Sequence, residues 1–234
     1  RHAHEQHRQG RTPSPRLARR GNRCLSALAD ADPMLTIGLT GGIASGKSIV
    51  ARMLQERGCH IIEADLVAHE FLKPANSVAQ QVVAEFGPET LGPTGAIDRA
   101  KLGEIVFGNP EKLARLNALT HPPVLKEIAR QLAEIAQKDN SSIAVVVAAL
   151  HVEAGYYKNF DRLAVAWCTR EQQLSRLMNR GMTREQAERR IASQLPLDKK
   201  RQLADDVIDC SRTIEDTRRQ TEEVLSRWKK INAA

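Results

Sequence analysis

The chain has 234 residues, of which 41% are hydrophobic and 27% charged, as is typical of a globular α/β protein with one or two subdomains. No apolar run approaches the roughly 20 residues of a membrane-spanning helix. The formal net charge of +7 favours polyanionic partners, but an aromatic content of 3% is too low for the stacking platforms that bind single-stranded nucleic acid. We therefore expect phosphorylated small molecules as partners, and no nucleic acid or membrane.

The cysteines show no C-x-x-C spacing, which disfavours a zinc site or a redox motif. They are Cys24, Cys59, Cys168 and Cys210. Because thiols stay reduced in the cytoplasm, we expect a cytoplasmic protein with free cysteines.

Residues 1–33 lack hydrophobic periodicity and are rich in Arg, His, Gln and Pro, which predicts a disordered N-terminal extension. The segment contains no apolar stretch typical of a secretory signal, and its Ser content is low for a transit peptide. Met34 immediately precedes the first predicted strand, so we expect the folded domain to comprise residues 34–234.

The first predicted strand covers residues 34–40, and GGIASGKS, Gly41 to Ser48, follows it with the pattern G-x-x-x-x-G-K-[ST]. Apolar residues at helical spacing then predict a helix that ends near Gly58. A strand, a glycine-rich loop and a helix in this order form a phosphate-binding loop, because the glycines turn backbone N–H groups inward at the positive end of the helix. In such a loop Lys47 reaches the β- and γ-phosphates of a nucleotide and Ser48 offers a hydroxyl to Mg²⁺.

The second predicted strand covers residues 59–64 and places Asp65 at its carboxyl end. Ligands of open parallel sheets bind at the carboxyl ends of the strands, so Asp65 and Lys47 should share a cleft. Asp65 would there accept a proton from an attacking hydroxyl or help to hold Mg²⁺. The alternative is that Asp65 only caps the following helix.

Four stretches resemble the dephospho-CoA kinase family from Met34 to the C-terminus. They are GLTGGIASGKS, IIEADLVAHE, GAIDRAKLGEIVFGNPEKLARLNALTHPPV and RLMNRGMTREQAERRIASQLPLDKKRQLADDVID. The resemblance implies a P-loop core with a five-stranded parallel sheet flanked by helices, a helical acceptor-binding domain and a helical lid. It also implies transfer of the ATP γ-phosphate to the ribose 3′-hydroxyl of dephospho-CoA with Mg²⁺, the last step of coenzyme A biosynthesis, by a monomer or weak homo-oligomer.

The resemblance assigns roles to individual residues. Asp65 matches the catalytic aspartate, and His69 and His121 become candidates for the acceptor site. The predicted nucleotide site consists of Gly42, Ile43, Ala44, Ser45, Gly46, Lys47, Ser48 and Ile49. The core would comprise residues 34–73 and 141–234, the acceptor-binding insertion residues 74–140, and the lid about residues 171–204.

The chain departs from the family pattern at four places. Ala44 stands where the family usually has Gly; alanine is compatible with a negative φ there but costly if the residue needs a positive φ. Glu63 replaces the usual Asp two residues before Asp65, and the segments 149–153 and 210–212 replace Pro-Leu-Leu-Phe-Glu and Asn-Ser-Gly. An alternative interpretation is therefore a P-loop kinase with a different small-molecule hydroxyl acceptor.

The insertion is mostly helical by pattern. We expect helices over 78–86, 99–107, 110–119 and 122–137, with a turn over 91–97. Pro122 suits the first position of the last helix, so His121 would precede it. His121 then either contacts the acceptor or fixes its own helix terminus.

The C-terminal part should complete the sheet. We expect strands over 143–150, 163–168 and 207–209, helices over 171–180, 184–193 and 197–204, and a closing helix over 213–231. The expected inward face of the closing helix consists of Ile214, Thr217, Val224, Leu225 and Trp228. No Asp ends the third strand, and Glu153, the nearest acid, either orients a Mg²⁺-bound water or caps a turn.

The three short helices form a basic region that could close over the site as a lid. Their cations are Arg176, Arg180, Arg184, Arg189, Arg190, Lys199, Lys200 and Arg201. A mobile lid would neutralise charge on the transferring phosphoryl group and exclude water; the alternative is a solvated helical hairpin. Arg176 and Arg180 are four residues apart, so we expect one helix face to present both as catalytic cations.

Overall fold

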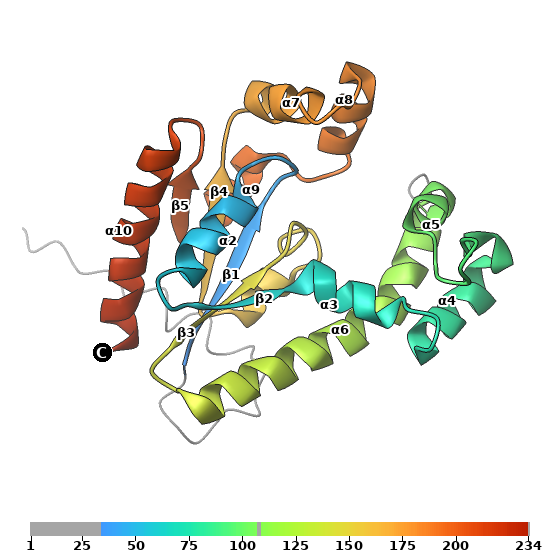
Figure 1. The fold of residues 1–234 in the computed structure, drawn as a ribbon, viewed down its shortest axis with the longest axis horizontal. Helices are drawn as coiled ribbons and strands as arrows, with labels where there is room; N and C mark the ends of the chain where they lie inside the picture. Colours follow the sequence, from blue (N-terminus) through green and yellow to red (C-terminus); the bar gives the residue numbers. More distant parts are fainter. Residues whose placement is uncertain (1–33, 107–108, 234) are drawn as a thin grey trace, which may run out of the picture.

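The computed structural model describes residues 34–106 and 109–233 of the chain. Its centre is a five-stranded sheet in the order β2-β3-β1-β4-β5, in which every neighbouring pair is parallel (Figure 1). The strands are β1 (Leu35–Gly41), β2 (His60–Glu63), β3 (Ile143–Val147), β4 (Arg162–Trp167) and β5 (Asp206–Asp209). All strands therefore end at the same edge, as the sequence predicted. The predicted disorder of residues 1–33 concerns a segment outside the described residues.

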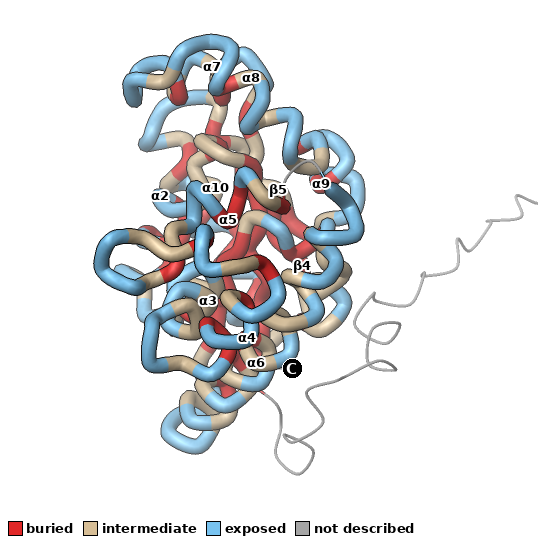
Figure 2. The backbone as a smooth tube through the Cα atoms, turned by 90° about the vertical axis from the view of Figure 1, so that its right-hand side faces the viewer, coloured by how far each residue is buried: buried red, intermediate tan, exposed pale blue. Residues whose placement is uncertain are grey.

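Helices cover both faces of the sheet. One face packs against α2 (Lys47–Gln55) and α10 (Ile214–Asn232), and the other against α3 (Ala64–Phe71) and part of α6 (Pro110–Lys138). Every residue of β1 and β3 is buried, as the continuous apolar runs predict for central parallel strands. Figure 2 shows the buried residues concentrated in this layer.

The insertion projects from the sheet as a separate helical cluster (Figure 1). Its helices α4 (Ser77–Phe86) and α5 (Arg99–Val106) pack with the first half of α6 around Val82 and Leu102. A short 3-10 helix, η3 (Pro88–Thr90), and a bridge between Leu91 and Ile97 form the turn that the sequence predicted.

The predicted lid consists of α7 (Arg170–Met178), α8 (Arg184–Ala192) and α9 (Leu197–Leu203). Thr169 and Gln172 form a capping box at the start of α7, and Thr183 and Gln186 form another at the start of α8. These reciprocal bonds fix where both helices begin. A second 3-10 helix, η4 (Tyr156–Asn159), lies between β3 and β4.

The prediction of two helices over 110–119 and 122–137 was wrong, because α6 is continuous and contains Pro122 and Pro123. Asn109 begins this helix by accepting hydrogen bonds from the N–H groups of Glu111 and Lys112. An internal proline normally breaks a helix because it removes an N–H and crowds a carbonyl. Here packing outweighs that cost, since one half of α6 lies in the insertion and the other against the sheet.

The inward face predicted for the closing helix was right for all but one residue. Ile214 is 55% exposed, whereas the other four are buried. Trp228 is fully buried, and its indole N–H donates to Asp206 Oδ2 at 2.8 Å. Asp206 also accepts from Arg162 Nε at 2.9 Å and from Arg227 Nη2 at 3.2 Å. This buried carboxylate joins β4, β5 and α10.

We expect Asp206→Ala to lower the free energy of unfolding by about 3 kcal/mol, because it leaves the buried Trp228 N–H and Arg162 Nε without their acceptor. Arg227→Ala is the matched control. It should cost less than about 1 kcal/mol, because the Arg227 side chain is 55% exposed. Urea titration followed by circular dichroism measures both, and equal losses would contradict this account.

Candidate active site

The phosphate loop runs from the end of β1 to the start of α2, and its glycines are required by close packing. A Cβ atom at Gly42 would lie 2.5 Å from Gln173 Nε2, and one at Gly46 would lie 2.9 Å from Cys210 Sγ. Gly46 also has φ +106 and is the N-cap of α2. The hydroxyl of Ser45 in this loop is buried and has no hydrogen-bond partner among the described residues. The loop therefore holds one polar group, the Ser45 hydroxyl, that no atom in the described part of the chain satisfies.

Ala44 occupies the left-handed region with φ +58, and it is the single non-glycine residue with positive φ in the described part of the chain. Ala44 therefore has the positive φ at which alanine is costly, and not the negative φ with which it is compatible. An L-residue in this conformation costs about 1–2 kcal/mol relative to an ordinary backbone. Other contacts must hold the loop in this shape.

Lys47 and two carboxylates lie at the carboxyl edge of the sheet. Lys47 is the first residue of α2, Glu63 ends β2, and Asp65 is exposed in the first turn of α3. Burial raises the pKa of Glu63 above its usual value; the Lys47 ammonium opposes this shift and the Asp65 carboxylate adds to it. The N-cap of α3 is Glu63, so the alternative in which Asp65 caps that helix is wrong.

Ser48 and Ile49 are exposed in the first turn of α2, beside Lys47 in the chain. A hydroxyl at this position can ligate a cation bound to phosphates at the helix N-terminus. Among the described residues, no group of three or more His, Cys, Asp or Glu side chains could hold a metal ion on its own.

Side chains of the predicted lid contact the loop directly. Arg176 donates from Nη1 to the Ala44 carbonyl at 3.1 Å and from Nη2 to the Cys210 carbonyl at 2.6 Å. Arg180 lies beyond the end of α7 and is exposed, so the prediction that it shares a helix face with Arg176 was wrong. A glycine follows it, Gly181 with φ +88, which marks the turn that ends this helix.

The two candidate histidines differ in environment. His121 is half-buried in the middle of α6, with its ring edge-on to Tyr156 at 5.1 Å between centroids. It is therefore not at a helix terminus, and the alternative that it fixes one is wrong. Burial lowers its pKa, so the imidazole is neutral near pH 7. His69 is exposed in the last turn of α3.

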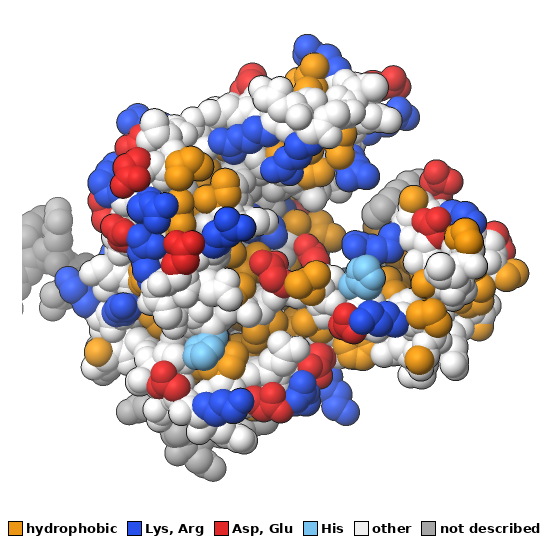
Figure 3. Space-filling view, viewed as in Figure 1, with side chains coloured by type: hydrophobic (Ala, Val, Ile, Leu, Met, Phe, Trp, Pro, Cys, Tyr) orange, Lys and Arg blue, Asp and Glu red, His pale blue; other side chains and the backbone are white. Residues whose placement is uncertain are grey.

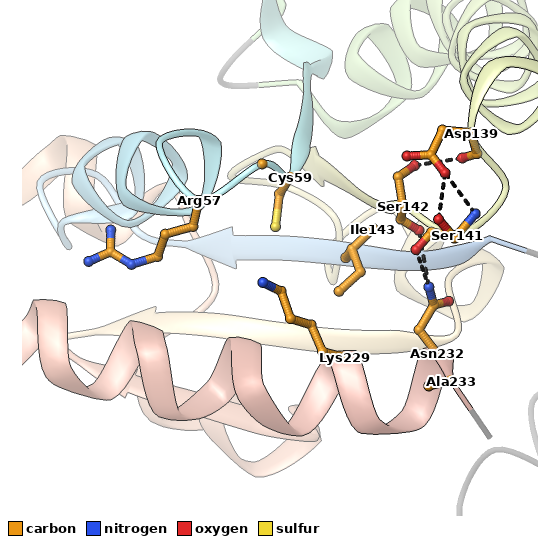
Figure 4. A pocket seen from close by; sticks show the side chains of 10 residues that line it. Arg57, Cys59, Asp139, Ser141, Ser142, Ile143, Lys229, Asn232 and Ala233 are labelled. Atoms are coloured by element: carbon orange, nitrogen blue, oxygen red, sulfur yellow. Dashed lines mark hydrogen bonds between the residues drawn. The ribbon is translucent and has the colours of Figure 1, made fainter.

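The surface is hollowed between the lid and the insertion, and positively charged side chains lie on both walls (Figure 3). Two further pockets lie elsewhere. One of about 340 Å³ is lined by Cys59, Ser142, Lys229 and neighbouring residues at the amino ends of the strands (Figure 4). The other, of about 530 Å³, lies within the insertion near Glu85 and Arg115. Neither is lined by a residue of the phosphate loop.

The loop after β3 is tied to the lid by a buried cation. Lys200 is fully buried and donates from Nζ to the Ala149 carbonyl at 2.6 Å, which also accepts from Thr40 Oγ1 at 3.1 Å. The same Nζ pairs with Glu153 Oε1 at 2.7 Å, and that oxygen accepts from the Leu195 N–H at 3.0 Å. Glu153 therefore joins this loop to the α8–α9 linker.

The comparisons with known proteins agree with one another. The family model for dephospho-CoA kinase matches residues 35–216. The chain is 48% identical to a dephospho-CoA kinase of Carboxydothermus hydrogenoformans, over 82% of this chain and 94% of that one. It is 46% identical to a Geobacter metallireducens dephospho-CoA kinase, over 84% and 96% of the two chains.

The chain belongs to the dephospho-CoA kinase family. Its fold is similar to that of the solved Campylobacter jejuni dephospho-CoA kinase, with a TM-score of 0.62, 29% identity and coverage of 84% of this chain and 98% of that one. A solved Thermus thermophilus protein gives a TM-score of 0.70 at 28% identity, over 83% and 98% of the chains. Among the described residues, no helix combines the length and apolar character needed to cross a bilayer.

His151 lies in the segment 149–153, which follows β3, and it is 3% exposed. Its Nε2 lies 2.9 Å from the Val146 carbonyl, so Nε2 carries the proton in the neutral ring. Nδ1 is buried without a partner among the described residues. Burial is the main reason why the pKa of His151 falls to about 4.

We expect His151 to make the free energy of unfolding decrease as the pH falls. The unfolded chain takes up a proton near an ordinary pKa of about 6.5, whereas folded His151 stays neutral until about pH 4. Its contribution is therefore complete above about pH 6.5 and is lost as the pH falls toward 4, by about 2 kcal/mol between pH 7.5 and 5. His151→Leu should remove this slope. If the unaltered protein and His151→Leu gave parallel curves of unfolding free energy against pH, His151 would not be the source of the slope.

The Lys200–Glu153 pair predicts unequal effects of removing its two members. Glu153→Ala should cost about 3 kcal/mol of stability because it leaves a buried ammonium without its counter-charge. Lys200→Met should cost less than about 1 kcal/mol, since an apolar chain of similar length can fill the same space. Thermal and urea unfolding of both variants and of the double variant measure this. A larger loss of unfolding free energy from Lys200→Met than from Glu153→Ala would contradict this explanation.

Proposed function

We propose that the protein transfers the γ-phosphate of ATP to the ribose 3′-hydroxyl of dephospho-CoA, giving coenzyme A and ADP. The observation that carries this proposal is the meeting of the phosphate loop, Lys47 and Asp65 at one edge of the sheet, beside the hollow between lid and insertion (Figure 3). The family to which the chain belongs supplies the identity of the acceptor.

The loop fits a nucleotide polyphosphate. Glycines 41, 42 and 46 leave no room for side chains, so the main chain itself faces a ligand with its N–H groups. The unpartnered Ser45 hydroxyl offers one more donor. Lys47 adds a positive charge at the N-terminus of α2, where the helix dipole also favours phosphate.

The same edge fits Mg²⁺. Ser48 would hold the ion together with the nucleotide phosphates, and Glu63 and Asp65 would accept hydrogen bonds from its waters, because Mg²⁺ prefers oxygen ligands and keeps several waters. When bound, Mg²⁺ neutralises charge that builds up on the phosphate oxygens.

Asp65 acts as the base in this proposal. The 3′-hydroxyl oxygen attacks the γ-phosphorus while its proton passes to Asp65, and the bond to the β-phosphate oxygen breaks to release ADP. Lys47 stabilises the negative charge on the transferring group. Glu63 lies close enough to Asp65 and Lys47 to interact with both charges, although burial is the main reason why its pKa is raised.

The acceptor would lie against the insertion. The neutral imidazole of His121 has one donor and one acceptor nitrogen, and Tyr156 fixes the orientation of the ring. His69 and the exposed Arg180 lie at the surface, where they can meet phosphate groups of either substrate. The side chains of His151, Val152 and Cys210 are buried, so these three departures do not line the acceptor hollow, whereas Arg212 is exposed.

The test is ADP release with ATP and Mg²⁺, measured with and without dephospho-CoA. We expect acceptor-dependent ADP and coenzyme A formation, and a loss of about 10²- to 10⁴-fold in kcat for Asp65→Asn, because the base is removed without a change of size. The KM for ATP should change little. Glu70→Gln, which changes an exposed carboxylate of the same helix, is the control and should keep full activity.

A different result would change the conclusion in a defined way. ATP hydrolysis that does not depend on dephospho-CoA would contradict the acceptor and would call for other hydroxyl compounds as acceptors. Full activity of Asp65→Asn would contradict the base, and Glu63 would then be the next carboxylate to change.

A further inference from the structure

Three side chains of the lid form hydrogen bonds with the main chain of Ile43 and Ala44 in the phosphate loop. Gln194 Oε1 accepts from the Ile43 N–H at 2.8 Å, and Gln173 Nε2 donates to the Ile43 carbonyl at 2.7 Å. Arg176 Nη1 donates to the Ala44 carbonyl at 3.1 Å. We refer to Gln173, Arg176 and Gln194 as the lid bracket. It engages both polar main-chain groups of one residue and the carbonyl of the next.

The bracket acts on the strained part of the loop. Ala44 has φ +58, in the region that an alanine avoids. The loop's own turn is closed by a hydrogen bond of 3.2 Å from the Ser45 N–H to the Gly42 carbonyl. Without hydrogen bonds from outside the loop, Ala44 could rotate to negative φ. This rotation would relieve the strain and reorient the peptide groups on either side of Ala44. The three bracket bonds oppose that rotation.

The members of the bracket are themselves held in place. Gln173 is 5% exposed and lies in the first turn of α7, directly after its capping box. Arg176 uses its second terminal nitrogen to donate to the Cys210 carbonyl after β5. Gln194 is followed by Leu195, whose N–H donates to Glu153. The bracket thus spans from the end of β5 to the α8–α9 linker.

We propose that Gln173, Arg176 and Gln194 are positioning residues that hold the phosphate loop in its strained, nucleotide-accepting shape through the main chain of Ile43 and Ala44. The affinity for ATP then depends on the lid even before any acceptor binds, because apparent affinity scales with the fraction of loops in the competent shape. This inference rests on the proposed function only in that the loop holds ATP. It also assigns Arg176 to the loop rather than to the transferring phosphoryl group.

A double-mutant cycle between Gln194 and Ala44 tests the proposal. Calorimetric titration of the full chain with ATP and Mg²⁺, without acceptor, gives the Kd. Gln194→Ala should raise this Kd by about three- to tenfold, the effect of losing one hydrogen bond. In the Ala44→Gly background the same change should raise Kd less than about twofold, because glycine adopts positive φ without strain. The Kd for dephospho-CoA should stay unchanged.

Gln202→Ala is the matched control, since Gln202 is an exposed glutamine of α9; its Kd for ATP should equal that of the unaltered protein. Arg176→Lys is a second, independent variant that keeps the charge and loses the planar fork. If Arg176 positions the loop, Arg176→Lys weakens ATP binding and Ala44→Gly restores it. If Arg176 instead acts as a cation on the transferring group, ATP binding stays intact and Ala44→Gly has no effect.

The outcomes separate the bracket from the proposed function. An unchanged Kd for Gln194→Ala, or an equal rise in both backgrounds, would overturn the bracket while leaving dephospho-CoA phosphorylation in place. If the effects of Gln194→Ala and Ala44→Gly on the Kd for ATP are not additive but dephospho-CoA is not phosphorylated, the bracket is supported and the proposed acceptor is contradicted.

Discussion

The phosphate loop is packed so closely at Gly41, Gly42 and Gly46 that these positions have no room for a side chain, and this constraint shapes the carboxyl edge of the sheet. The loop must be made of small residues, and its surroundings must press against it closely. Cys210 after β5 lies beneath Gly46, and Gln173 of α7 lies against Gly42. The last strand and the lid are thus placed where the phosphate loop requires support.

The buried Lys200 is understandable in the same terms. Burying an ammonium is costly, and desolvation lowers its pKa although Glu153 opposes the shift. The Lys200 ammonium is, however, the central link in a series of contacts that connects the end of β1 to the phosphate loop that follows it. The members of this series are Thr40, Ala149, Lys200, Glu153, Leu195, Gln194 and Ile43. The lid is therefore joined to the core on both sides of the phosphate loop.

Sequence patterns predicted the sheet and the loop because both depend on local features, continuous apolar runs and glycine spacing. They failed where distant packing decides. Two prolines inside α6 signalled a break, but the helix is held by separate clusters at its two halves. Gln173 and Gln194 were missed because a glutamine that bonds a main chain far along the sequence leaves no periodic signal. Arg180 was misjudged because the end of α7 lies two residues before it.

Three departures from the family pattern, Ala44, His151 and Cys210, bear on the shape of the loop and the packing around it, whereas Glu63 lies beside Lys47 and Asp65 and Arg212 is exposed. Ala44 brings strain that glycine would avoid, and the residues that hold it belong to the lid. Cys210 packs beneath Gly46, and its burial raises the pKa of the thiol to about 12, so it acts as an apolar filler. His151 is likewise neutral and enclosed. Lys47, Ser48 and Asp65 remain at the carboxyl edge of the sheet, so the changes at Ala44, Cys210 and His151 bear on the packing around the loop and leave these three side chains in place.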